Sequence, residues 1–148
     1  MHVFIFSFNV NPVSVKAADQ KIAQLNSELS TQKIIQKHCD SYRLCRKVIE
    51  DCKSAKDPKA YRTKHQAEYH LHDSLKKELQ NLGVTKIPSS DKIKKRIENL
   101  ESEQTASVRE KQGLQEKQKL LNTIQQNFNV LLDAPEMQPP LSEKENTL

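Results

Sequence analysis

The stretch DPKAYRTKHQAEYHLHDSLKKELQNLG, residues 57–83, decides the fold. Asp57 followed by Pro58 is a typical helix start, because aspartate caps free backbone amides and proline at the first helical position lacks an amide that would go unpaired. Gly83 is a typical helix end, since glycine adopts the left-handed C-cap without a Cβ penalty. We therefore expect a helix over 58–82. Its predicted packing face repeats at spacings of three and four, as in a heptad-like seam, and comprises Tyr61, His65, Tyr69, His72, Leu75, Leu79 and Leu82.

The sequence before this stretch predicts one long helix. Apolar residues between Ile22 and Cys52 fall close to one stripe, which predicts a helix over 14–54. Residues 1–13 begin with the apolar run MHVFIFSFNV, whose pattern suits a short strand or the remnant of a preceding domain. This run lacks the basic start and the cleavage site of a signal peptide, and it is too short to span a bilayer. We expect no membrane association.

The sequence after Gly83 predicts a third helix and a tail. The connector GVTKIP ends at Pro88, after which Ser89 or Ser90 can cap a helix over 89–132. Polar residues replace leucine at three seam positions in the middle of this helix, Gln104, Ser107 and Lys111. Because such positions pack less tightly, we expect moderate stability there. Residues 133–148 are rich in proline and polar side chains, and we expect them to be disordered.

These patterns together predict an all-α fold. Of the 148 residues, 35% are hydrophobic and 5% aromatic, which is too little for a large globular core. The chain has only two glycines and many good helix formers, so long helices are favoured. We expect these helices to form an elongated, coiled-coil-like hairpin or bundle. The pattern leaves open whether they fold back within one chain or pair between chains.

The charge of the chain, +5 in total, is distributed unevenly. Between residues 33 and 64, ten basic residues stand against four acidic ones, whereas ten of each stand between residue 83 and the end. The first half could therefore attract a polyanion such as DNA, and the alternative is a solvated helix face. The candidate DNA-binding residues are Lys33, Lys37, Arg43, Arg46, Lys47, Lys53, Lys56, Lys59, Arg62 and Lys64.

One motif suggests a metal site, the triplet His70-Leu71-His72. Two such histidines converge on one ion when they lie on a strand, because residues i and i+2 then point the same way. In a helix the two imidazoles diverge by about 200°. A metal-dependent nuclease using both histidines is therefore the least favoured reading, and we expect no metal, no cofactor and no catalytic residue.

The three cysteines, Cys39, Cys45 and Cys52, lack the spacing of a zinc site, and their odd number argues against a disulfide framework. Small buried thiols serve as packing residues. We therefore expect reduced cysteines in a cytoplasmic protein.

Four segments follow one another in a characteristic order: IAQLNSEL (22–29), KHCDSYR (37–43), YRTKHQAEYHLH (61–72) and LGVTKIPS (82–89), before a charged last helix. This arrangement, over about residues 16–133, resembles the region that follows the nuclease domain in mobilisation relaxases of Gram-positive integrative elements and transposons. In that family a separate N-terminal domain nicks one DNA strand at the transfer origin through a tyrosine, with a histidine-bound metal. None of those catalytic residues can be carried onto this chain.

The resemblance implies a non-catalytic helical module that acts in conjugative DNA transfer and contacts DNA or accessory proteins of the transfer apparatus. Residues 1–10 depart from the family pattern, which suggests a truncated or split relaxase gene. The alternative is a structural coiled-coil protein, unrelated to DNA, that associates with itself through its helix seams.

Overall fold

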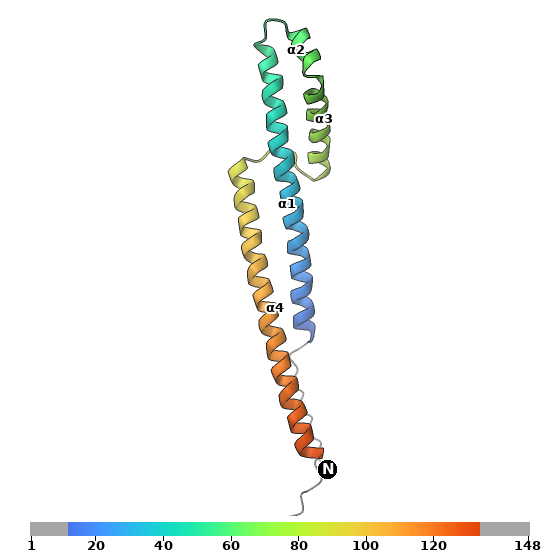
Figure 1. The fold of residues 1–148 in the computed structure, drawn as a ribbon, viewed down its shortest axis with the longest axis vertical. Coiled ribbons are helices and arrows are strands. Elements are labelled where there is room, and N and C mark those ends of the chain that lie inside the picture. The colour runs from blue at the N-terminus through green and yellow to red at the C-terminus, as the bar shows by residue number, and fades with distance from the viewer. Residues whose placement is uncertain (1–11, 134–148) are drawn as a thin grey trace, which may run out of the picture. The chain divides into compact units, whose positions relative to one another are not determined.

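The computed structural model describes residues 12–133, and this part of the chain is all α-helical, as predicted. Its helices are α1 (Pro12–Lys53), α2 (Pro58–Lys64), α3 (Gln66–Asn81) and α4 (Ser90–Asp133) (Figure 1). The described residues divide into two compact units, 20–108 and the combination of 12–19 with 109–133. The predicted strand over residues 1–11 and the predicted disorder over 134–148 lie outside the described residues.

Three caps set the helix boundaries as the sequence indicates. The Asp57 side chain accepts a hydrogen bond from the Ala60 amide at 3.2 Å, with Pro58 at the first position of α2. Gly83 ends α3 with a φ of +83°, in the left-handed region that favours glycine. The Ser89 hydroxyl accepts a hydrogen bond from the Lys92 amide at 3.3 Å and caps α4.

The prediction of one helix over 58–82 is wrong at His65, where the chain breaks into α2 and α3. His65 has φ −107° and ψ 25°, outside the helical region, although no glycine or proline marks the site. The short α2 lies at the end of α1, where the Cys52 thiol donates to the Pro58 carbonyl at 3.6 Å. From there α3 runs back beside α1 (Figure 1). The continuous apolar pattern over 58–82 therefore does not show this break.

The core of the 20–108 unit joins α1, α3 and α4. Its buried members are Leu25, Leu29, Ile35 and Cys39 of α1, Leu79 of α3, and Ile93, Ile97 and Leu100 of α4. Tyr42, Val84 and Ile87 pack against this cluster. Leu79 is the member that α3 contributes, so it ties that helix to the other two.

The first half of α4 runs antiparallel to α1 within this unit. Lys33 pairs with Glu101 at 3.1 Å, and Arg96 pairs with Glu28. Nearer the connector, the Arg43 guanidinium donates to the Pro88 carbonyl. These contacts fix which residues of the two helices face each other.

The predicted packing face of residues 61–82 is buried unevenly. Leu75 and Leu79 are buried, at 5% and 1% exposure. Its aromatic members, Tyr61, His65, Tyr69 and His72, are half-buried. Leu82 departs from the prediction: it lies beyond α3 and is 38% exposed, because the chain turns there before Gly83 and leaves the helical stripe.

The unit formed by 12–19 and 109–133 is held by fewer buried side chains. Lys111 pairs with Asp19, and Leu114 and Leu121 are half-buried. Several large apolar residues near the end of α4 are exposed, among them Leu120, Val130, Leu131 and Leu132. No helix among the described residues has the length and apolar character needed to cross a membrane.

Candidate nucleic-acid interface

The end of α1, the turn after it and α2 bring together a group of basic side chains. We call this group the basic tip and define it as Lys47, Lys53, Lys56, Lys59, Arg62 and Lys64. The turn that connects α1 to α2 is short and hydrogen-bonded: the Ser54 amide donates to the Asp51 carbonyl at 3.1 Å, and the Ala55 amide donates to the Cys52 carbonyl at 3.3 Å. The backbone that carries the basic tip is therefore ordered.

All six side chains of the basic tip are exposed, and none of them forms an ion pair within the described part of the chain. The acidic residues of the same stretch are partly engaged: Glu50 pairs with Arg46 at 3.1 Å, and Asp57 caps α2. Residues 46–64 hold seven basic residues against three acidic ones. The tip thus carries a positive excess that can attract a polyanion.

The structure divides the ten predicted DNA-binding residues into three residues with intramolecular partners, Lys37, and the six residues of the basic tip. Lys33 pairs with Glu101, and Arg46 pairs with Glu50. Arg43 pairs with Asp40 and donates to the Pro88 carbonyl. Lys37 is exposed but lies along the middle of α1, away from the turn. The six residues of the basic tip remain, all of them exposed and without an ion pair among the described residues.

Two tyrosines, Tyr61 and Tyr69, lie next to the basic tip. The Arg62 guanidinium lies over the ring of Tyr69, with its carbon 5.0 Å from the ring centroid, and Tyr61 packs against His65 at 4.3 Å between centroids. A hydrogen bond with the Cys52 side chain, together with burial, raises the pKa of Tyr69. Burial, with the nearby Asp51 carboxylate, raises the pKa of Tyr61. Both phenols are therefore neutral at pH 7 and do not offset the lysine charges.

His72 of α3 and His38 of α1 each make a contact between these two helices. His72 stacks on Tyr42 of α1 with 4.6 Å between ring centroids, and its Nδ1 lies 3.2 Å from Asp73. His38 of α1 pairs with Glu78 at 3.0 Å and joins the two helices. His70 of α3 is exposed. Among residues 12–133, no group of three His, Cys, Asp or Glu side chains could hold a metal ion.

The three cysteines are buried and form no disulfide. Burial raises the pKa of the Cys39 thiol, which is 0% exposed, and it also raises that of Cys45. A raised pKa keeps these groups as thiols at neutral pH, where the thiolate would be the reactive form. Cys39 belongs to the core cluster.

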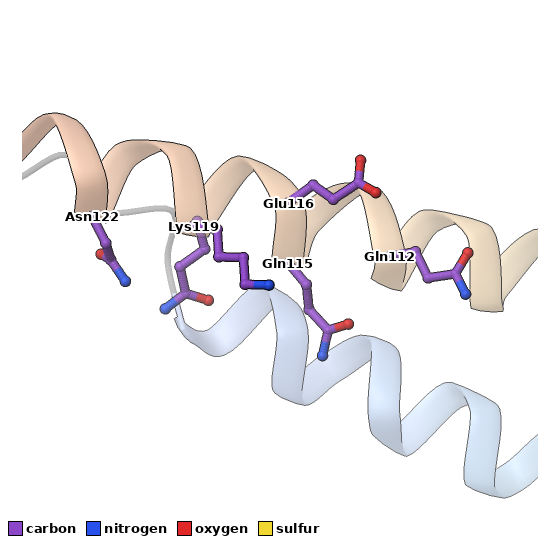
Figure 2. Close-up of a pocket in the computed structure, with 6 residues that line it drawn as sticks. Gln112, Gln115, Glu116, Lys119 and Asn122 are labelled. Carbon is purple, nitrogen blue, oxygen red and sulfur yellow. The ribbon is translucent and has the colours of Figure 1, made fainter.

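A concavity of about 700 Å³ lies along α4, in the unit that contains residues 109–133. Figure 2 shows that its lining side chains project from this one helix. They are Gln112, Gln115, Glu116, Gln118, Lys119 and Asn122. Because the lining residues are all polar and come from one helix, this concavity lacks the features of a small-molecule site.

A second hollow, of about 320 Å³, lies beside the start of α4. The sequence patterns did not predict it. Residues 83–148 as a whole carry no charge excess, so their total charge does not indicate a site here. A positive charge excess is present over a shorter stretch, since residues 86–96 hold five basic residues and one acidic residue.

The chain matches no protein-family model, no curated protein and no solved structure.

Proposed function

We propose that this chain is a non-catalytic helical module that binds DNA through its basic tip, without sequence preference. The observation that carries the proposal is the group of six exposed cations around one ordered turn, none of which forms an ion pair within the described residues. Lysine and arginine side chains that neutralise phosphates release counterions, and this release drives non-specific binding. The short α2 offers no long basic helix for the major groove, which favours backbone contacts over base reading.

The biological setting that we propose is conjugative DNA transfer, with this chain as part of a cytoplasmic relaxase or mobilisation protein. The support is the resemblance in the order of its segments, from IAQLNSEL at 22–29 to LGVTKIPS at 82–89. In this setting a separate nuclease domain would nick the DNA, and the helical module would hold DNA or an accessory transfer protein.

The test is DNA binding by the purified full chain, measured by fluorescence anisotropy with a labelled duplex of arbitrary sequence at low salt. We expect a dissociation constant of about 10⁻⁴ to 10⁻⁶ M at physiological salt, the order typical of non-specific contacts, and tighter binding at low salt. The triple variant Lys53→Glu, Lys56→Glu, Lys59→Glu should bind much more weakly. All three side chains are exposed and lie outside the core, so the variant should keep its helical circular dichroism spectrum.

A matched control reverses two exposed lysines of α4, Lys117→Glu and Lys119→Glu, which lie outside the 20–108 unit. These changes should leave binding nearly unchanged. Equal losses in both variants would mean that total charge, and not the basic tip, governs binding. No detectable binding at low salt would reject the proposal.

A second candidate function is self-association as a structural coiled-coil protein. The observation that favours it is the set of exposed apolar residues near the end of α4, with Val130, Leu131 and Leu132 between 64% and 74% exposed. Sedimentation velocity over a range of concentrations tests it. We expect a dimer that the variant Leu131→Glu weakens if this function holds, and a monomer at all concentrations if it does not.

A further inference from the structure

The hollow beside the start of α4 is built from two helices and the connector before α4. Its lining residues are Gln32 of α1, Pro88 of the connector, and Lys92, Ile93, Lys95, Arg96 and Asn99 of α4. We call it the α4 groove. All of these residues belong to the 20–108 unit.

The α4 groove has a fixed base. Ile93 is 2% exposed and belongs to the core cluster, so its position is set by packing. The Arg43 guanidinium donates to the Pro88 carbonyl, which holds the connector against α1. Arg96 of α4 pairs with Glu28 of α1. Core packing of Ile93 and the hydrogen bond to the Pro88 carbonyl therefore hold two of the lining residues in place.

The rim of the α4 groove is cationic. Lys92 and Lys95 are exposed, and neither forms an ion pair in the part of the chain that the structure describes. Asp91 is the single acidic residue between 86 and 96. Gln32 and Asn99 add amide groups that can donate hydrogen bonds. An anionic ligand would therefore meet several donors around an apolar base.

We propose that the α4 groove binds an acidic peptide segment of a protein partner, with one apolar side chain of the peptide against Pro88 at the base of the groove and its carboxylates on Lys92 and Lys95. A volume of about 320 Å³ accommodates one or two side chains. A DNA duplex is a convex rod whose charged backbone would not fill an apolar hollow, so the shape favours a peptide. Charge complementarity of this kind directs association and selects the partner.

The experiment uses the full chain and a fluorescein-labelled nine-residue peptide in which glutamate and leucine alternate. Two matched peptides serve as controls, one with lysine in place of glutamate and one with serine in place of leucine. We expect anisotropy to rise with the glutamate–leucine peptide and to change little with either control. Equal binding of the serine peptide would remove the role of the apolar base and overturn the proposal.

Two variants of the chain locate the site. Lys92→Glu with Lys95→Glu should weaken binding about tenfold or more, because each exposed ion pair contributes less than a tenfold factor and reversal adds repulsion. Asn99→Trp should block the groove without changing its charge. Exposed lysines of α3 supply the control, Lys76→Glu with Lys77→Glu, which should bind like the unaltered chain.

The remaining outcomes separate this proposal from DNA binding at the basic tip. The triple variant of Lys53, Lys56 and Lys59 should bind the peptide normally, and an unlabelled duplex should not displace the peptide. If Asn99→Trp binds the peptide as the unaltered chain does, or if a duplex displaces it, the α4 groove is not a peptide site. Each variant must also retain the helical circular dichroism spectrum of the unaltered chain.

Discussion

Replacing Leu79 with alanine tests how α3 is held against α1 and α4. Leu79 is 1% exposed and is the member that α3 contributes to the core cluster with Cys39 of α1 and Ile93 of α4. Removing a fully buried leucine side chain loses its transfer free energy and leaves a cavity, which together cost about 3 kcal/mol. Leucine and alanine have similar helix propensities, so the backbone contributes little to the difference.

Leu71 is the matched control, because it lies on the same helix but is 47% exposed. Leu71→Ala should change the free energy of unfolding by less than about 0.5 kcal/mol. Urea denaturation followed by circular dichroism at 222 nm measures both variants. For a domain of this size, a loss of about 3 kcal/mol corresponds to a fall in Tm of about 10 °C. Equal effects of the two substitutions would refute the packing of α3 described above.

Three further perturbations test individual contacts. Asp57→Ala should lower the free energy of unfolding by about 1 kcal/mol in urea denaturation, because the Ala60 amide loses its cap, whereas Asp57→Asn should have little effect. The buried thiols should react slowly with Ellman's reagent in the native chain and rapidly in guanidinium chloride, and fast native labelling of Cys39, which is 0% exposed, would contradict its place in the core. A backbone hydrogen bond and the His65 side chain lower the pKa of Glu68 below its ordinary value of 4.5, so this carboxylate stabilises the fold above that pH and the contribution is lost as the pH falls through the lowered pKa. The difference in unfolding free energy between the unaltered chain and Glu68→Gln should therefore shrink in acid, and a difference that grows would contradict the contact.

Local chemistry explains why the sequence predicted the helical class and the caps. Asp57, Pro58 and Gly83 act through their own backbone and side-chain preferences, which require no knowledge of the tertiary structure. The break at His65 was not predicted because no glycine or proline marks it and the apolar pattern continues through it. The predicted packing of Leu82 was wrong because a stripe drawn at regular spacing does not show where the helix ends.

The basic tip and the α4 groove also differ in how far the sequence predicts them. The basic stretch was visible from composition, but the sequence did not show that Arg43 is held by Asp40 and the Pro88 carbonyl. The α4 groove depends on the register between α1 and α4, which places Gln32 beside Asn99 across 67 positions of sequence. Charge summed over a long stretch hides such a site, since the basic start of α4 is balanced by acidic residues further along the helix.

The salt dependence of DNA binding tests the central claim most directly. If four to six cations of the basic tip contact phosphates, a plot of the logarithm of the association constant against the logarithm of salt concentration should have a slope of about −4 to −5. The triple variant Lys53→Glu, Lys56→Glu, Lys59→Glu should flatten this slope markedly. A slope near zero for the unaltered chain, or one that the triple variant leaves unchanged, would contradict DNA binding through the basic tip.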